Sequence, residues 1–277
     1  MIKVPRLLRL RLHKYALSHL PRPCVASPQP VTILIPLAVK DIANARLCVA
    51  SLRRHVRHPI TGIVVAGQDD DRIRAFCAGE GLRYLNENDV LPKAVLENPY
   101  MSRKTGMNGW LRQQFLKLAA FTYIDADIIL TQDSDTFLVR DMAYLQGDKQ
   151  ICYLADEYTP YFYHFAEKLL GPVPRHPRSF VAHAMLWQRD LMQGLEQHVQ
   201  ARCGKGLVEA ILASLDDSND KWLSEFEIYG NFLWNFHKDR MATRYWYNVK
   251  LPAGPLPGAA RLEQKYRRFN SVSAHIH

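Results

Sequence analysis

The chain has 277 residues and a mass of 31.9 kDa, which suits one large α/β domain or two small ones. Its composition, 48% hydrophobic and 23% charged, excludes a mainly disordered protein, and no apolar stretch approaches the roughly 20 residues of a membrane-spanning helix. The five cysteines are widely spaced and include no Cys-x-x-Cys pair, which argues against a disulfide framework or a cysteine zinc site and fits a reducing cytoplasm.

The net charge of +9 is concentrated at the two ends of the chain. Residues 1–22 contain six Lys or Arg and no acidic residue, and residues 261–268 carry a net charge of +3, so the body between them is neutral. A nucleic-acid-binding protein usually carries its basic stripe on the folded body, so we expect no nucleic-acid partner. Basic ends favour contact with an anionic membrane surface. We therefore expect a cytoplasmic protein, with peripheral contact at the inner membrane face as a hypothesis.

The N-terminal segment has the features of an extension rather than of a leader peptide. Residues 1–20 are rich in leucine, but arginines interrupt the apolar part and no run of 7 apolar residues occurs, which argues against a secretory signal peptide. A membrane-surface helix, a helix packed on a partner and a solvated terminus are the alternatives. Prolines then recur over residues 21–30 and indicate a linker. We predict an extension over residues 1–24 and a single domain over residues 25–277.

The pattern that follows alternates strands and helices. Short apolar, β-branched runs predict strands at 31–37, 63–66, 82–85 and 128–131. Helices are expected after Asp41, which can cap the first of them, and over residues 110–121. This alternation predicts an α/β fold of Rossmann-like type, with a mostly parallel sheet flanked by helices. After about residue 150 the pattern becomes irregular and aromatic.

Three Asp-x-Asp patterns occur, and their position relative to a strand separates them. Asp69 and Asp71 follow the expected strand 63–66. Asp125 and Asp127 precede the expected strand 128–131, whereas Asp133 and Asp135 follow it directly. Open α/β sheets bind ligands at the carboxyl ends of their strands. Two carboxylates on a turn at that end can reach one hard divalent cation, which keeps coordination places for phosphate oxygens. The alternative is a turn in which the aspartates bond the backbone.

Four stretches together resemble one protein family. They are Gly109-Trp-Leu-Arg-Gln-Gln-Phe-Leu-Lys117, Asp133-Ser-Asp-Thr-Phe137, Ser179-Phe-Val-Ala-His-Ala-Met-Leu186 and Ser224-Glu-Phe-Glu-Ile-Tyr-Gly-Asn231. The family is a group of bacterial glycosyltransferase-like proteins of the GT-A fold, many described only as a domain of unknown function. The resemblance implies a GT-A-like fold, a nucleotide-sugar donor, a divalent metal (Mn²⁺ or Mg²⁺) and transfer to a hydroxyl of a glycan or glycolipid. It also implies a role in bacterial cell-surface polysaccharide or lipopolysaccharide synthesis.

The resemblance further implies the ligands of the metal. Asp135, the second aspartate of the motif, becomes the direct ligand, and Asp133 contacts either the ribose or the metal through water. GT-A enzymes often take another metal ligand from a histidine near the C-terminus, and His275 follows an expected last strand at 270–274. The alternative for His275 is a disordered tail.

The donor is expected to lie among polar residues at the ends of the first two strands and on the helix before the motif. Gln113 and Lys117 are four residues apart and share one helix face, where a cation could neutralise the diphosphate. The alternative is an ordinary solvated face. The predicted nucleotide-sugar-binding residues are Pro36, Lys40, Asp69, Arg112, Gln113, Lys117 and Asp133.

We expect the catalytic base to be one of the two glutamates of the last motif. Ser224 and Glu227 have the spacing of a capping box, which gives Glu227 a structural task. Glu225 is then freer to point into a cleft, and an inverting transferase needs a carboxylate to take the acceptor proton. We predict Glu225 as the base, with Glu227 as the rival. His183 is expected to be a core or acceptor-pocket histidine.

Three other functions remain as alternatives. A haloacid-dehalogenase-type phosphatase also uses Asp-x-Asp after a strand, but the first strand, 31–37, offers no aspartate nucleophile. A nucleotidyltransferase would need a glycine-rich basic loop after that strand, and residues 36–40 contain no glycine. A catalytically dead sugar- or membrane-binding scaffold is the non-enzymatic alternative.

Overall fold

The structure is a computed structural model that describes residues 24–103, 108–157, 159–216, 223–252 and 256–274. Residues 1–23 of the expected extension and the histidines 275 and 277 lie outside this part. The domain boundary at residue 25 and the membrane contact of the N-terminal segment therefore stay predictions.

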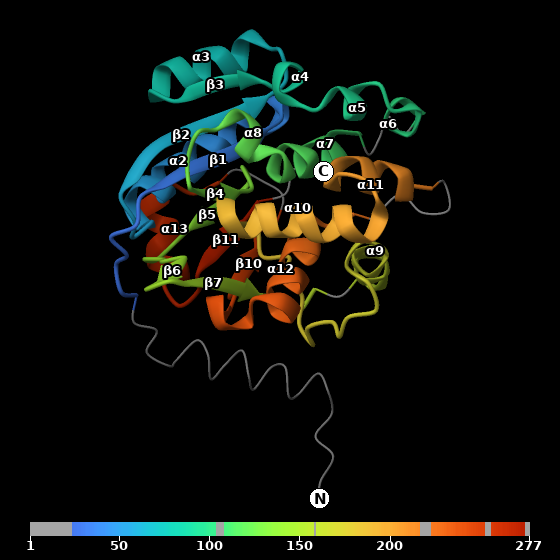
Figure 1. The fold of residues 1–277 in the computed structure, drawn as a ribbon. Helices are drawn as coiled ribbons and strands as arrows, with labels where there is room; N and C mark the ends of the chain where they lie inside the picture. The colour runs from blue at the N-terminus through green and yellow to red at the C-terminus, as the bar shows by residue number, and fades with distance from the viewer. Residues whose placement is uncertain (1–23, 104–107, 158, 217–222, 253–255, 275–277) are drawn as a thin grey trace, which may run out of the picture.

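A five-stranded sheet in the order β3-β2-β1-β4-β8 forms the centre of the fold (Figure 1). Its strands are β1 (Val31–Leu37), β2 (Ile60–Gly67), β3 (Arg83–Asn86), β4 (Ile128–Gln132) and β8 (Ala184–Gln188). The first four are parallel, and β8 pairs antiparallel with β4. All four strands expected from the sequence are present, and the prediction of a mostly parallel sheet in an α/β fold is confirmed.

The side chains of the central strands pack alternately on two sides of the sheet. In β1, Leu34 packs into one apolar cluster, whereas Ile33 and Ile35 pack into the other. Successive side chains of a strand point to opposite faces, so a strand buried on both faces reads as a continuous apolar run. This is why the β1 segment is apolar almost throughout.

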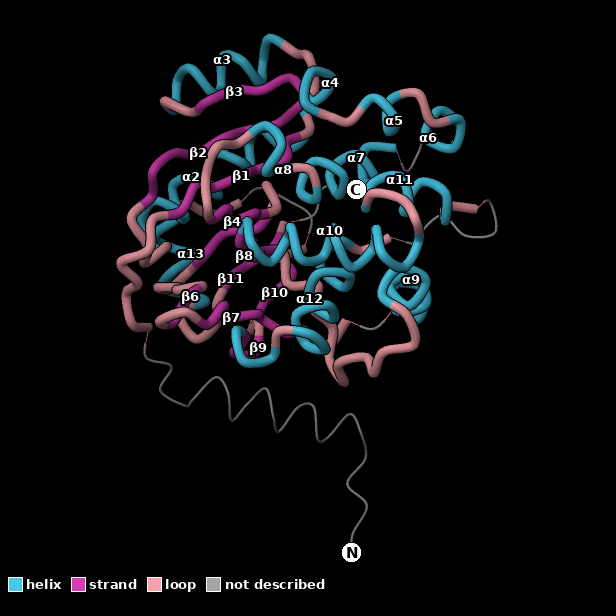
Figure 2. Tube along the Cα trace, viewed as in Figure 1, coloured by secondary structure: helices cyan, strands magenta, loops and turns pink. Residues whose placement is uncertain are grey.

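Helices cover both faces of the sheet (Figures 1 and 2). One cluster joins the sheet to α2 (Ile42–His55), α3 (Asp71–Glu80) and α13 (Ala259–Tyr266). The other joins it to α7 (Asn108–Leu118), α9 (Pro160–Leu170), α10 (Arg189–Cys203), α11 (Leu207–Ser214) and α12 (Glu225–Phe236). Short helical segments complete the described part: α4 (Glu87–Val90), α5 (Lys93–Leu96), α6 (Pro99–Arg103), α8 (Ala120–Tyr123) and the 3₁₀ turns η1 (Val39–Asp41) and η2 (Lys238–Arg240).

Three local expectations differ from the structure. The helix expected over 110–121 ends at Leu118, and α8 follows as a separate turn. Asp41 occupies the N-cap position of α2, but its side chain makes no capping hydrogen bond. The second half of the chain is more regular than its pattern indicates, because its aromatic residues pack as the buried sides of α9 and α12.

Two small sheets extend the fold beyond β4. One has the order β10-β11-β5 and contains β5 (Thr136–Leu138), β10 (Asn248–Lys250) and β11 (Ser271–Ser273). The other has the order β6-β7-β9 and contains β6 (Leu145–Gln146), β7 (Lys149–Leu154) and β9 (Met241–Tyr245). The expected last strand is confirmed as β11, which pairs antiparallel with β5 directly after the Asp-x-Asp motif.

Within the described ranges, no helix combines the length and the apolar character needed to cross a bilayer.

Candidate active site

The motif Asp133-Ser134-Asp135 lies on the turn between β4 and β5, at the carboxyl end of β4. The Asp133 N–H donates to the carbonyl oxygen of His183 (2.9 Å), and the Thr136 N–H donates to the carbonyl oxygen of Asp133 (3.2 Å). On the far side of the turn, the Ala274 N–H donates to the carbonyl oxygen of Asp135 (2.9 Å). The backbone thus fixes the turn from both sides, and the Asp133 side chain is left to bond other side chains.

Lys117 is the centre of the charge network at this turn. Its Nζ lies 2.7 Å from Asp133 Oδ1 and 2.8 Å from Glu225 Oε1, and the side chain is 4% exposed. The ammonium also lies 4.4 Å from the centroid of the Phe226 ring. Burial opposes the charged form of Lys117, but Asp133 and Glu225 outweigh it and raise its pKa. The alternative of a solvated helix face is therefore wrong for Lys117.

His183 completes the contacts of Asp133, a role that the sequence did not predict. Its Nδ1 lies 3.2 Å from Asp133 Oδ2. In the described part it is the one non-glycine residue with a positive φ, 57°, a conformation that costs energy and gathers at functional sites. Burial would lower the pKa of His183, but Asp133 outweighs it and raises that pKa. No periodicity marks this residue; the one available signal was its place in the motif 179–186.

Both oxygens of Asp133 are thus occupied. Burial alone would raise the pKa of this carboxyl group, but the charges of Lys117 and His183 lower it instead. Asp133 is therefore held as a carboxylate by its two neighbours. It acts as the link between α7, which carries Lys117, and the segment before β8.

The two glutamates of α12 have different surroundings. Ser224 Oγ accepts from the Glu227 N–H (3.3 Å), so half of the predicted capping box is present. The Glu227 carboxylate does not return to the cap: it accepts from Ser179 Oγ (2.6 Å) and from the Phe180 N–H (2.9 Å). The expectation that Glu225 is free is wrong, because its carboxylate is buried against Lys117. Glu225 does border a cavity, as expected. Its catalytic role stays a prediction.

One cavity borders the motif at Asp133, and a second cavity shares Gln113 with it. The first, of about 120 Å³, has charged groups from four segments on its wall: Lys117, Asp133, Glu157 and Glu225. The second, of about 250 Å³, lies at the carboxyl ends of β1 and β2 and is lined by Leu37, Ala38, Gln68, Glu87, Asn108, Arg112 and Gln113 among others. Arg112 bonds Glu87 there at 2.7 Å. The structure therefore brings Arg112, Gln113, Lys117 and Asp133 together.

Three of the expected donor-binding residues line neither of these cavities. Pro36 is buried within β1, opposite Ala66 of β2. Lys40 is exposed in η1. Asp69 is exposed after β2 and forms an ion pair with Arg74. Their roles in donor binding stay predictions.

The residues at the motif match a divalent cation in charge and in ligand type. No group of three His, Cys, Asp or Glu side chains suited to a metal occurs in the described ranges, and His275 lies outside them. Mg²⁺ is commonly held by one or two carboxylates together with the phosphate oxygens of a substrate, and the motif can supply these carboxylates. Lys117 and His183 bond the two oxygens of Asp133, and Asp135 Oδ1 accepts a hydrogen bond from Thr136 Oγ1 (3.2 Å). Direct ligation of a cation by Asp135 stays a prediction.

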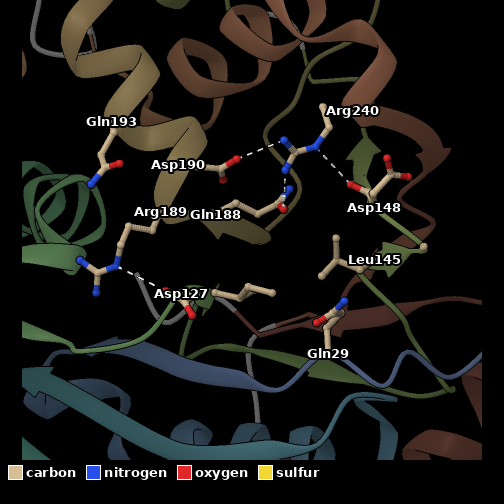
Figure 3. Close-up of a pocket in the computed structure, with 11 residues that line it drawn as sticks. Gln29, Asp127, Leu145, Asp148, Gln188, Arg189, Asp190, Gln193 and Arg240 are labelled. Carbon is tan, nitrogen blue, oxygen red and sulfur yellow. Dashed lines mark hydrogen bonds and ion pairs between the residues drawn. The ribbon is translucent and has the colours of Figure 1, made fainter.

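The other Asp-x-Asp patterns lie elsewhere in the fold. Asp127 precedes β4 and lines a cavity of about 430 Å³ at the opposite end of that strand (Figure 3). Four of its five charged groups pair with each other: Arg189 Nε lies 3.9 Å from Asp127 Oδ1, and Arg240 Nη1 lies 3.1 Å from Asp190 Oδ2. This cavity is larger than those at the motif, but most of its charges are paired and it lies at the amino end of β4.

Comparison with known proteins gives one family and several solved structures. The chain is similar to the apo form of mouse xyloside xylosyltransferase 1, with a TM-score of 0.49 and 12% identity over 89% of this chain and 98% of that one. It is also similar to an active-site mutant of LgtC, with a TM-score of 0.44 and 15% identity over 89% of this chain and 88% of that one. No curated protein matches the sequence. Residues 29–259 match the model of a family described as a family of unknown function, DUF6492, and the chain belongs to that family.

Proposed function

We propose that this protein is a glycosyltransferase that moves a sugar from a nucleotide-sugar donor to a hydroxyl group of a glycan or glycolipid. The observation that carries the proposal is the position of Asp133-Ser134-Asp135 at the carboxyl end of β4, beside a cavity that shares Gln113 with a second one. Ligands of open α/β sheets bind at this edge. The resemblance of four sequence motifs to GT-A glycosyltransferases supports the same function.

The two parts of the donor, the nucleoside and the sugar, occupy separate cavities. The larger, at the ends of β1 and β2, takes the nucleoside, and the smaller takes the sugar beside Asp133 and Lys117. Gln113 lines both cavities and marks where the diphosphate passes between them. The paired rings of Trp110 and Phe162, 6.2 Å apart and on the wall of the smaller cavity, offer an apolar surface to the sugar.

A divalent cation, Mn²⁺ or Mg²⁺, is part of the proposal. Asp135 would hold it directly and Asp133 through water, and the cation would supply positive charge for the leaving diphosphate. The charge of the site supports this. The carboxylates of Asp133, Asp135, Glu157 and Glu225 outnumber the ammonium of Lys117 and the imidazole of His183 even when that imidazole is protonated, so a bare diphosphate would meet net repulsion. Lys117 holds Asp133 and Glu225 in place on the wall of the smaller cavity.

The acceptor and the location follow from the resemblance and from the basic ends. We propose a role in cell-surface polysaccharide or lipopolysaccharide synthesis, by a cytoplasmic protein at the inner membrane face. Glycolipid acceptors are found at such a surface, and a polybasic segment is attracted to anionic lipids.

The proposal is tested by calorimetry with UDP and GDP, with Mn²⁺ and with a chelator. We expect one of these nucleotides to bind with Mn²⁺ and to lose most of its affinity with chelator. Asp135→Asn should weaken the Mn²⁺-dependent binding by at least about 10-fold, because a direct ligand matters at least as much as an outer-sphere group. Asp127→Asn is the matched control: it changes the second aspartate of another Asp-x-Asp pattern, at the other end of β4, and should leave binding unchanged. Equal binding with and without Mn²⁺ contradicts the metal site.

A further inference from the structure

Three carboxylates line the smaller cavity, and two of them are committed to Lys117. Asp133 and Glu225 each place an oxygen within 2.8 Å of the Lys117 ammonium. A proton added to Glu225 would remove the charge from one side of a buried ion pair. Breaking a buried pair in this way is costly, because the other charge then stays buried without its partner. Neither carboxylate is well suited to take up a proton during a reaction.

Glu157 is the third carboxylate, and its surroundings are different. Its side chain is exposed and lines the cavity together with Lys117 and Phe162. Within the described residues it has no hydrogen-bond or ion-pair partner. Its charge interacts with the imidazole of His183 through space, without a hydrogen bond. A carboxylate that borders the cavity, reaches solvent and is not held in a hydrogen-bonded ion pair can accept a proton from an incoming hydroxyl group.

The backbone that carries Glu157 is held on the preceding side by several hydrogen bonds. Ala155 exchanges two backbone hydrogen bonds with Ser179, of 2.8 and 3.2 Å. Asp156 accepts a hydrogen bond from Tyr245 Oη at 2.5 Å. Ser179 itself donates to the buried carboxylate of Glu227 at 2.6 Å. The buried Glu227 thus anchors Ser179, and Ser179 anchors the strand end from which Glu157 extends.

We propose that Glu157 is the general base of the transfer, an inference that rests on the proposed function. In the reaction, an acceptor oxygen forms a bond to the anomeric carbon of the donor sugar and loses its proton to a Glu157 carboxylate oxygen. The bond between that carbon and the diphosphate oxygen breaks, and its electron pair leaves with the nucleoside diphosphate. One displacement inverts the anomeric centre. Glu225 and Lys117 position Asp133 and take no part in the proton transfer.

Donor hydrolysis tests this assignment without knowledge of the acceptor, because water can serve as the acceptor. The donors are UDP-glucose, UDP-galactose, UDP-N-acetylglucosamine and GDP-mannose, with Mn²⁺ present, and the readout is release of UDP or GDP. Glu157→Gln should lower kcat for the donor that is hydrolysed by roughly 100-fold or more, the usual contribution of such catalysis. KM and the Kd for the released nucleotide should change little. Glu157→Asp, which keeps a carboxylate, should recover part of the rate.

Glu167→Gln is the matched control, since Glu167 is an exposed glutamate of α9 that does not line the cavity. It should hydrolyse the donor at the rate of the unaltered protein. Full turnover by Glu157→Gln overturns the proposal, and loss of turnover in Glu225→Gln alone returns the role of base to Glu225. If the unaltered protein binds UDP or GDP but hydrolyses no donor, the base assignment fails while donor binding stands. If it binds neither nucleotide, the proposed function itself fails.

Discussion

The contacts of Lys117 in the folded structure differ from what its position in the sequence indicates. In the sequence, Lys117 is one cation on an amphipathic helix, and Glu225 is one of two acids at a helix start. In the structure, Lys117 joins Asp133 to Glu225, and His183 holds the other oxygen of Asp133. The cluster is partly buried, so each charge depends on its partner. Removal of Lys117 would take away the cation that Asp133 and Glu225 share, and would leave the buried Glu225 without a charged partner.

Glu227 leads to a testable dependence of stability on pH. Burial raises the pKa of its carboxyl group to about 7, against the lowering effect of Ser179, Phe180 and Asn231. In the unfolded chain the pKa of the same group lies near its ordinary value of 4.5. Between these values the unfolded state loses this proton first, so rising pH favours unfolding. The contribution of Glu227 is thus most favourable below about pH 4.5 and declines until about pH 7.

The change is tested by comparing the unaltered protein with Glu227→Gln, which cannot ionise. The free energy of unfolding, measured by urea denaturation from pH 4.5 to pH 8, should fall for the unaltered protein relative to the variant by about 3 kcal/mol. The pH dependence of the difference is the readout, so a constant cost of the substitution does not matter. Parallel curves for the two proteins contradict a raised pKa.

At the scale of elements, α12 is the helix that links the site to the core. Its first turn carries both acids, with Glu225 bonded to Lys117 and Glu227 bonded to Ser179. Two residues that are two positions apart on a helix point in different directions, which is why these two acids meet different partners. Gly230 lies one turn further, where the ring of Phe180 packs against the helix backbone. The segment Ser179–Phe180 is thereby held by both Glu227 and Gly230.

Gly230→Ala should destabilise the protein by about 1–3 kcal/mol through overpacking. A Cβ atom at this position would lie 2.2 Å from Cγ of the buried Phe180 ring, so the ring has to move. Gly194→Ala on α10 is the control, because its nearest neighbour would be Phe232 Cζ at an ordinary 3.5 Å. It should gain about 0.5–1 kcal/mol from helix propensity. Urea denaturation measures both values, and equal stability of the two variants contradicts close packing at Gly230.

At the scale of the molecule, the distribution of charge separates the ends from the body. The described domain is neutral over most of its length, and the six positive charges of residues 1–22 precede it. The first described strand begins at Val31, after the proline-rich segment. The described sheet is therefore built from residues that come after the basic segment 1–22.

Deletion of residues 1–22 should leave the thermal unfolding transition in place and weaken binding to anionic vesicles. Each Lys or Arg close to an anionic membrane contributes about 1 kcal/mol to the free energy of binding. The measurement is cosedimentation with phosphatidylserine-containing vesicles, with neutral phosphatidylcholine vesicles as the control. Unchanged binding after the deletion, or no binding of the full chain, contradicts the membrane hypothesis.

The sequence by itself determined the features that depend on neighbouring residues. The strands β1, β2, β3 and β4 follow from local apolar runs, because a strand buried on both faces must be apolar along its length. The position of Asp133 and Asp135 at the binding edge follows from their order after β4, since parallel strands share one carboxyl edge. The difference between this motif and Asp125–Asp127 was predictable for the same reason.

The tertiary structure alone decided which side chains meet. Lys117 and Glu225 are 108 residues apart in the sequence, and Asp133 and His183 are 50 apart. Their contacts depend on how α7, α12 and the segment before β8 pack around β4, and no local pattern encodes such distances. Burial also decides which of these acids needs a partner, because a buried charge requires one and an exposed charge does not. The buried Glu225 pairs with Lys117, and the buried Glu227 bonds Ser179 and Phe180. The exposed Glu157 lines the cavity.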